Sequence, residues 1–481
     1  MTAALKTPWL ADRARERPDD VALCCDGERI SWSSLAARAE SLAEGFSRLG
    51  VGRGDIVAVR SAPSPEMVAA LHAVQRLGAA MLPVNTRLAR PEAERILSHA
   101  LPRLLVDTIS GERADPGDVR VVDSFADVAR AGARSSCVPA RIDGDAALAV
   151  VFTSGTTGAP KGVVLTNANF AASADGSRRR LGHGAGDTWL ATMPLFHVGG
   201  LSILARSALE GSTVVLEDGF DAARCAAVLT RGDATMISLV PTMLHRVLEH
   251  TFDVSARVRA VLVGGAALPA VLARRALDRG LPVAATYGMT EACSQIATGE
   301  PGSIYAAQGR TGKALDGVDI RIEPIENGEH AGGWGQILVR GPGVARGYLR
   351  NPAADRAAFR RGWLATGDIG RLGEDRALEV SGRLDDLIVS GGENVSPNEV
   401  ERVLEEHRDV AESMVIGEPD DEWGQKIVAL VVLRRTGVPP PEDEIRGWCR
   451  GRLAAYKIPR EVRVVGDLPR NATGKLLRKR A

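Results

Sequence analysis

The sequence predicts an α/β protein, with a large N-terminal domain of layered, mainly parallel sheets plus a β subdomain, and a small α+β C-terminal domain. The 481 residues exceed one ordinary core, so two or more domains are expected. Strand-like and helix-like segments alternate through most of the chain, which is typical of parallel sheets covered by helices. After Gly317, short strand-like segments and Gly-rich turns dominate as far as Gly382 and indicate the β subdomain.

The first elements follow from apolar periodicity and from residues that begin or end helices. Ser34–Leu49 is predicted to form an amphipathic helix that ends near Gly50, and Pro65–Leu77 a second helix. Asp55–Val59 lies between them and is predicted to be a strand. The apolar run Ala146–Phe152 is predicted to be a further, buried strand.

The middle of the chain repeats this alternation. Strands are predicted at Thr235–Leu239, Ala260–Val263 and Val283–Thr286. Helices are predicted to begin at Pro241 and at Leu268–Pro269, and Gly280 is predicted to close the second of them.

The C-terminal part is predicted to be a separate unit. A hinge is expected at Arg383–Asp386, which divides the chain into domains 1–383 and 384–481. Ser396 and Glu399 are predicted to form a capping box, with Pro397 at the first helical position. The last hundred or so residues indicate the order β-α-β-β-α-β. The basic end, Lys475–Arg480, is interpreted as a solvated tail rather than an anion-binding segment.

Bulk composition excludes several classes of function. Lys plus Arg and Asp plus Glu number 60 each, so we expect neither nucleic acid nor a membrane surface as a partner. The cysteines form no C-x-x-C pair and have no histidine at zinc spacing, which favours a reducing cytoplasm over a disulfide framework or metal knot. They are Cys24, Cys25, Cys137, Cys225, Cys293 and Cys449. No signal-peptide core is present, and glycines and a proline interrupt the longest apolar run, so no membrane span is expected.

The segment Thr153–Gly162 has the composition of a phosphate-binding loop. Its glycines let backbone N–H groups approach an anion, its hydroxyls add donors and its lysine adds charge. The candidate ligands are Thr153, Ser154, Gly155, Thr156, Thr157, Gly158 and Lys161. Because Lys161 is followed by Gly162, the segment is not a Walker A loop, and it lacks the dinucleotide-binding glycine pattern. A surface turn rich in Ser, Thr and Gly is the alternative interpretation.

Four further motifs accompany this loop along the chain. They are Tyr287–Glu291, Gly362–Asp368, Gly382–Asp386 and Asn471–Lys475. In this order and approximate spacing the five segments resemble those of the adenylate-forming enzymes, which include acyl-CoA ligases, adenylation domains and luciferases. The resemblance covers essentially the whole chain, and it implies that the small domain is mobile.

A narrower resemblance is to the o-succinylbenzoate–CoA ligases, which serve menaquinone biosynthesis. It rests on Pro8–Leu10, Met193–Ser202, Thr235–Ser238, Tyr287–Gln295 and Tyr456–Pro459. The resemblance implies a ligase that uses ATP, Mg²⁺ and CoA on a small carboxylate. The carboxylate attacks the α-phosphorus of ATP, and the CoA thiol then displaces AMP. Catalysis must therefore neutralise charge and align the attacking groups.

For the nucleotide, the resemblance implies a role for each motif. The loop would hold the β- and γ-phosphates, Thr290 would contact the α-phosphate and Glu291 would bind Mg²⁺. Tyr287 and Gly288 belong to the same nucleotide-binding segment. A helix N-cap with an acidic first turn is the alternative for Thr290 and Glu291.

Further nucleotide contacts are expected from three other segments. Gly264, Gly265 and Ala266 would line the adenine pocket. A tight turn is an alternative reason for these small residues, and both interpretations can hold. Asp368 would accept bonds from the ribose hydroxyls, with a surface Gly-Asp turn as the alternative. Arg383 would reach the ribose or a phosphate, and the nearby Asp385 matches the hinge position of the family.

The remaining candidates concern the transferred groups. Lys475 would bridge the carboxylate and the α-phosphate, where charge builds in the transition state. Gly391 and Gly392 would leave room for the pantetheine arm, although a β-turn explains them nearly as well. His197, Ser202 and Ser294 are the candidates for the acyl pocket. His197 is equally well explained as a structural histidine.

Three rival functions stay open on the sequence. The first is a CoA ligase for another aryl or alicyclic carboxylate in secondary metabolism. The second is a stand-alone adenylation enzyme that loads a carrier protein. The third, a binding protein on an inactive scaffold, is disfavoured because Glu291, Asp368, Arg383 and Lys475 are all intact. A homo-oligomer is neither indicated nor excluded.

Overall fold

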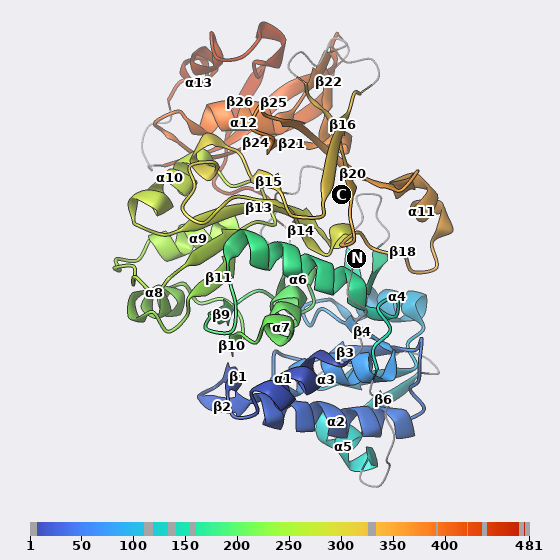
Figure 1. Cartoon of the computed structure of the whole chain (residues 1–481). Helices are drawn as coiled ribbons and strands as arrows, with labels where there is room; N and C mark the ends of the chain where they lie inside the picture. The colour runs from blue at the N-terminus through green and yellow to red at the C-terminus, as the bar shows by residue number, and fades with distance from the viewer. Residues whose placement is uncertain are drawn as a thin grey trace.

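A computed structural model describes residues 7–109, 119–132, 141–153, 160–325, 333–390, 393–420, 422–434, 440–470 and 476. In Figure 1 the chain runs from the N-terminal helices at the bottom to the small C-terminal domain at the top. The large domain carries helices α1 (Trp9–Glu16), α2 (Trp32–Arg48), α3 (Pro65–Leu77), α4 (Arg90–Ala100), α5 (Phe125–Gly132), α6 (Asn167–Leu181), α7 (Val198–Glu210), α8 (Ala222–Arg231), α9 (Pro241–Leu248), α10 (Ala270–Asp278) and α11 (Pro352–Ala358).

A mixed sheet, 14-stranded within the described residues, runs through the large domain. Its parallel part comprises β13 (Val283–Met289), β12 (Ala260–Val263), β11 (Met236–Leu239), β9 (Thr188–Ala191), β10 (Thr213–Leu216) and β1 (Val21–Cys25), with β2 (Glu28–Ser31) antiparallel at the edge. Its antiparallel part comprises β14 (Ser294–Thr298), β15 (Gly312–Ala314), β21 (Ala377–Arg383), β20 (Trp363–Leu372), β17 (Gly335–Arg340), β16 (Asp319–Glu323) and β19 (Phe359–Arg360). The pairing changes from parallel to antiparallel between β13 and β14.

A second sheet contains β18 (Gly347–Tyr348), β8 (Lys161–Thr166), β7 (Ala147–Thr153), β4 (Ala80–Pro83), β3 (Ile56–Arg60), β5 (Leu104–Asp107) and β6 (Arg120–Val122). The strands from β7 to β6 pair in parallel, whereas β8 runs antiparallel to both β7 and β18. The candidate phosphate loop therefore connects the two strands of a hairpin and does not lead into a helix.

Local sequence explains why the predicted elements form. Helix α3 begins after Ser64, whose hydroxyl accepts from Met67 N at 3.1 Å, and ends at Gly78 with φ +67°. Pro65 occupies its first turn, as predicted. The predicted strand Ala260–Val263 and helix Pro65–Leu77 match the observed bounds, and the other predicted elements of the large domain are confirmed to within a few residues.

The small domain packs its own core. It contains β22 (Ile388–Ser390), β23 (Glu393–Val395), α12 (Pro397–Glu405), β24 (Val410–Asp420), β25 (Gly424–Leu433), α13 (Glu442–Cys449) and β26 (Glu461–Val464). Its buried residues, among them Val400, Val415 and Ile445, form a separate cluster. The α+β character is confirmed. The predicted first strand is instead a hairpin, β22–β23, so the described order is β-β-α-β-β-α-β.

The predicted capping box at Ser396 and Glu399 is wrong. Ser396 is the N-cap of α12 but makes no side-chain cap. Its hydroxyl instead donates to Ser381 O at 3.1 Å, and the Glu399 carboxylate accepts from Lys457 Nζ at 2.8 Å. Both side chains therefore bind residues distant in the sequence, Ser381 and Lys457, and do not cap the helix.

Helix α12 carries two acidic side chains on one face, one turn apart. Glu401 is buried and accepts from Val415 N at 2.7 Å, while the half-buried Glu405 accepts from Ser413 N at 3.3 Å. Burial, followed by the charge of Glu401, raises the pKa of Glu405 to about 7. The folded protein thus retains a proton that the unfolded chain releases above pH 4.5, so this group makes stability fall as pH rises from 4.5 to 7.

The substitution Glu405→Gln is therefore expected to stabilise the protein in alkaline solution, because glutamine carries no charge to bury. At pH 8 we expect thermal unfolding about 2–5 °C above that of the native protein, and at pH 5 little difference. Thermal melts at both pH values measure the effect, with the exposed neighbour Glu406→Gln as the control. An equal shift of the unfolding temperature at pH 5 and pH 8 would contradict the raised pKa of Glu405.

Among the described residues, no helix is long and apolar enough to cross a bilayer.

Candidate active site

The nucleotide candidates gather where the parallel strands give way to the antiparallel ones. Asp368 of β20 accepts from Tyr287 Oη of β13 at 2.6 Å and from Arg383 Nη1 at 3.0 Å, and Arg383 is the last residue of β21. Arg383 Nη1 also donates to Thr366 O at 3.0 Å. Three strands thus position one carboxylate, whose oxygens keep further acceptor capacity for hydroxyl groups.

Electrostatics hold this cluster in one protonation state. Burial, together with the charge of Asp368, raises the pKa of Tyr287, so the phenol stays a donor. Burial alone would lower the pKa of Arg383, but the carboxylates of Asp368 and Asp385 outweigh it and raise that pKa. Arg383 Nε is buried without a hydrogen-bond partner among the described residues.

A second cluster surrounds Glu291. The residues 290–292 form a single 3₁₀ turn after β13, so Thr290 and Glu291 do not open an α-helix and the N-cap alternative is wrong. Glu291 is buried, and its Oε1 accepts from Tyr348 Oη at 2.8 Å. Lys161 Nζ lies 5.5 Å from the centre of the Tyr348 ring. Because β18 pairs with β8, Tyr348 connects the end of the phosphate hairpin to Glu291.

Tyr348 stays protonated beside this carboxylate. Burial and the charge of Glu291 raise its pKa, and Arg383 is near enough to oppose the rise. The Arg383 and Glu291 clusters are joined through the backbone, because β13, which carries Tyr287, continues directly into the turn that carries Glu291. A carboxylate with one oxygen bonded to a tyrosine retains acceptor sites, so Glu291 fits a hard cation such as Mg²⁺.

The backbone between the two clusters requires glycine. A Cβ on Gly288 would collide with the carbonyl of Ser294, because the register of β13 and β14 shifts at this point. Cys293 and Ser294 both have positive φ, +51° and +91°. Ser173 Oγ holds the Cys293 carbonyl at 2.6 Å. Glu291 and Cys293, which belong to this tight turn, are both buried.

The segment after β12 also approaches its neighbours closely. Gly264 N donates to Leu239 O at 3.1 Å, and a Cβ there would lie 2.9 Å from Thr286 O. Gly265 has φ +80°, and Gly265 and Ala266 are exposed. The chain bends at Gly265 and Ala266, and exposed backbone at this bend is compatible with the adenine contact that the resemblance implies, which stays a prediction.

The acyl-pocket candidates lie around the start of α7. His197 is the N-cap residue of this helix, and burial lowers the pKa of its imidazole to about 4. His197 Nε2 and Ser202 Oγ are both buried without hydrogen-bond partners among the described residues. The backbone of Ser294 lies beyond the tight turn at the start of β14. These polar atoms are available to a polar substrate.

Arg206 is a residue that the sequence interpretation missed. It lies one turn after Ser202 on α7 and is 2% exposed. Its guanidinium stacks 5.3 Å from the Trp189 ring, and its Nε and Nη2 have no partner among the described residues. Burial lowers the pKa of Arg206 to about 10, so it stays charged at neutral pH. An arginine four residues after a buried serine in an apolar helix was the signal available in the sequence.

Several predicted ligands lie outside the described residues. They are Ser154, Gly155, Thr156, Thr157, Gly158, Gly391, Gly392 and Lys475. The two ends of the phosphate loop are described: Thr153 and Lys161 face each other in the hairpin, and Thr153 Oγ1 lies 3.5 Å from Lys161 O.

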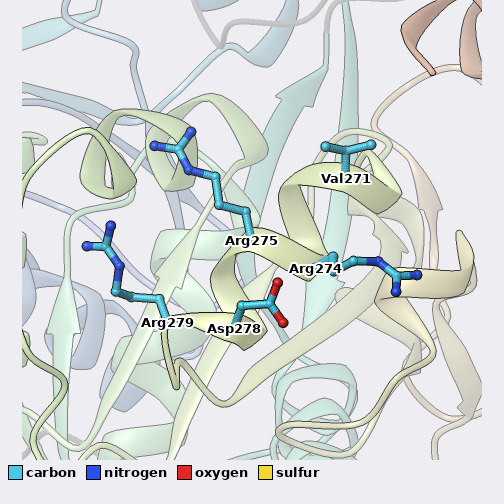
Figure 2. A pocket seen from close by; sticks show the side chains of 5 residues that line it. All are labelled: Val271, Arg274, Arg275, Asp278 and Arg279. Atoms are coloured by element: carbon cyan, nitrogen blue, oxygen red, sulfur yellow. The ribbon is translucent and has the colours of Figure 1, made fainter. Parts of the chain in front are cut away.

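An open hollow of about 390 Å³ lies elsewhere, beside α10. Figure 2 shows its lining residues, which come from that helix and its C-cap: Val271, Arg274, Arg275, Asp278 and Arg279. Arg275 donates to Leu248 O at 2.8 Å and Arg279 to His250 O at 3.0 Å. These guanidiniums bind carbonyls at the end of α9, so their role is structural.

Comparison with protein families gives two matches along the chain. The AMP-binding enzyme family matches residues 10–349, and the AMP-binding enzyme C-terminal domain matches residues 399–475. A 2-succinylbenzoate–CoA ligase of Bacillus cereus is 39% identical over 475 residues, 98% of this chain and 97% of the relative. The predicted boundary between residues 383 and 384 falls between the two family matches and stays a prediction.

Solved structures of related enzymes match the fold of this chain. The o-succinylbenzoate coenzyme A synthetase of Bacillus subtilis in complex with ATP and magnesium matches with a TM-score of 0.89 at 37% identity, covering 98% of each chain. A double mutant of that enzyme bound with its product analogue matches with a TM-score of 0.74 at 36% identity, covering 98% and 97%. The predicted fold class and the resemblance to the adenylate-forming enzymes are confirmed.

Proposed function

This chain belongs to the AMP-binding enzymes, and from that premise we propose that it is an ATP-dependent carboxylate–CoA ligase acting on 2-succinylbenzoate. The reaction would proceed through an acyl-adenylate and would supply menaquinone biosynthesis. The observation that carries the proposal is the arrangement around the tight turn 290–294. Glu291 accepts from Tyr348, whose ring lies beside Lys161 of the phosphate hairpin, and the buried Arg206 of α7 has two donors with no partner among the described residues.

In the first half-reaction, a carboxylate oxygen of the substrate bonds to the α-phosphorus of ATP and pyrophosphate leaves. Bound Mg²⁺, held by Glu291, would offset the negative charge of the phosphates. Asp368 would bind the ribose hydroxyls, and Tyr287 and Arg383 would fix the orientation of its carboxylate. In the second half-reaction the CoA sulfur bonds to the acyl carbon, the bond to AMP breaks and the thiol proton is released.

The choice of a dicarboxylate rests on Arg206. 2-Succinylbenzoate keeps a second carboxylate that does not react, and a buried charge is stable only when it is paired. Arg206 offers a buried cation with two donors that no described residue binds, and its neighbour Ser202 offers a hydroxyl. His197 is neutral at physiological pH, so it would contribute a hydrogen bond and no charge.

Tyr348 gives a first test of the nucleotide side. Phenylalanine at this position would keep the ring but remove the hydrogen bond that orients the Glu291 carboxylate. We expect Tyr348→Phe to raise the Mg²⁺ concentration for half-maximal pyrophosphate exchange about 10-fold, as is usual when a partner of a metal ligand is lost. Binding of Mn²⁺ followed by electron paramagnetic resonance gives a readout without turnover. Tyr305→Phe, near Asp375, is the control, and an unchanged metal dependence would exclude this role.

The function itself is tested by mass spectrometry of the purified protein with Mg-ATP, CoA and 2-succinylbenzoate. We expect both the CoA thioester and AMP. Pyrophosphate exchange with other carboxylates, but no thioester from 2-succinylbenzoate, would favour a ligase for another aryl or alicyclic acid. Acyl-adenylate that reacts with a carrier protein and not with CoA would favour the stand-alone adenylation enzyme. A cytoplasmic location, where ATP and CoA are available, is part of the proposal.

A further inference from the structure

Strand β21 of the large domain and helix α12 of the small domain touch through polar side chains. Ser381 Oγ donates to Ser396 Oγ at 2.8 Å, and Ser396 Oγ donates to Ser381 O at 3.1 Å. Two turns along the helix, Arg402 Nη1 donates to Glu379 Oε1 at 3.2 Å. Figure 1 shows β21 and α12 next to each other at the junction of the two domains. The Glu379–Arg402 ion pair therefore crosses the domain boundary.

Glu379 is held firmly by its own domain. Its side chain is 12% exposed, and Arg371 donates to its Oε2 through Nε at 2.9 Å. The Arg371 guanidinium in turn stacks 4.7 Å from the Trp334 ring. The carboxylate thus has a fixed position and accepts a second cation from across the boundary, whereas the side chain of Arg402 is half exposed.

The contact belongs to one arrangement of the two domains. This chain matches the ATP complex of the Bacillus subtilis enzyme at a TM-score of 0.89 and the complex of its double mutant with a product analogue at 0.74. Identity and coverage are nearly equal, so the two structures differ in how a large part of the chain is placed. Residues 384–481 are about a fifth of this chain, enough to account for such a difference if they are displaced as one unit. Displacement of that unit would separate Arg402 from Glu379.

We infer that Glu379 and Arg402 are a positioning pair that holds the small domain in the arrangement that serves acyl-adenylate formation. The pair opens before thioester formation. The inference rests on the function proposed above. It assigns these residues no contact with the reacting atoms: they set the fraction of molecules ready for the first half-reaction. Because Arg402 is half exposed, its contribution is that of a partly solvated ion pair and not of a buried one.

The substitution Arg402→Met tests the pair by separating the half-reactions. We expect pyrophosphate exchange to fall about 2- to 5-fold, the range for losing a partly solvated ion pair, while supplied acyl-adenylate is converted to thioester at the native rate or faster. Arg402→Lys keeps the charge and is expected to restore most of the exchange. Arg408→Met is the matched control, because Arg408 pairs with Asp409 and Glu444 inside the small domain.

Small-angle X-ray scattering gives a readout that does not depend on the substrate. With ATP and Mg²⁺, Arg402→Met is expected to broaden the distance distribution relative to the native protein, and Arg408→Met to leave it unchanged. Equal loss of both half-reactions, or no change in either, would overturn the inference. If the native protein makes no thioester, the proposed function fails, whereas an unaltered scattering profile of Arg402→Met refutes the pair itself.

Discussion

Replacing Arg206 with methionine is expected to raise the KM for 2-succinylbenzoate about 100-fold, with a smaller effect on kcat. Methionine fills much of the same space beside Trp189 but leaves the non-reacting carboxylate of the substrate without its cation. Removing one partner of a buried charge pair costs about 3–5 kcal/mol, which corresponds to roughly two to three and a half orders of magnitude in affinity, and the expected change lies at the lower end of this range. Steady-state kinetics with saturating ATP and CoA measure this change.

A substrate without the second carboxylate provides the control for this prediction. With 4-oxo-4-phenylbutanoate, which lacks the ring carboxylate, Arg206→Met is expected to be no worse than the native enzyme, because neither pairs a charge. Ser202→Ala, one turn away on α7, is expected to have a smaller effect of the same kind. Equal losses on both substrates would mean that Arg206 supports the fold by stacking on Trp189 and does not select the substrate.

Local sequence patterns identified those candidate site residues that lie within one segment, and their roles stay predictions. The loop at Thr153, the Thr290–Glu291 turn and Asp368 are each recognisable from neighbouring residues. Helix α3 and strand β12 were predictable for the same reason: a capping serine, a proline and an apolar run act over short distances. Such local patterns predict a helix or a strand but not the residues of other elements that it contacts.

The features that sequence patterns missed depend on pairs that the fold brings together. Tyr348 lies 57 residues beyond Glu291 and reaches it only because β18 pairs with β8. Arg206 is a candidate because two of its donors are buried without partners in the part of the chain that the structure describes. The capping box failed for a similar reason, because the Ser396 hydroxyl finds Ser381 in another domain. The side chain that the capping rule assigned to the helix end instead makes a hydrogen bond between the two domains.

Replacing Lys475 with alanine is expected to slow acyl-adenylate formation at least ~100-fold and to spare thioester formation from supplied acyl-adenylate. The reason is electrostatic: the attacking carboxylate and the α-phosphate are both anionic, and an ammonium group between them offsets the charge that builds up in the transition state. Lys475 lies outside the described residues, so the assignment rests on its motif, Asn471–Lys475.

The comparison with Arg402→Met makes the Lys475 experiment more informative. Both substitutions are expected to slow only the first half-reaction, yet for different reasons. Lys475 acts on the chemical step, so Lys475→Ala should leave the scattering profile with ATP and Mg²⁺ unchanged, while Arg402→Met alters the profile. Single-turnover measurement of adenylate formation gives the rate for each variant. Equal loss of both half-reactions in Lys475→Ala would remove Lys475 from the adenylation step and would leave charge neutralisation to Arg383, Lys161 and the Mg²⁺ that Glu291 is proposed to hold.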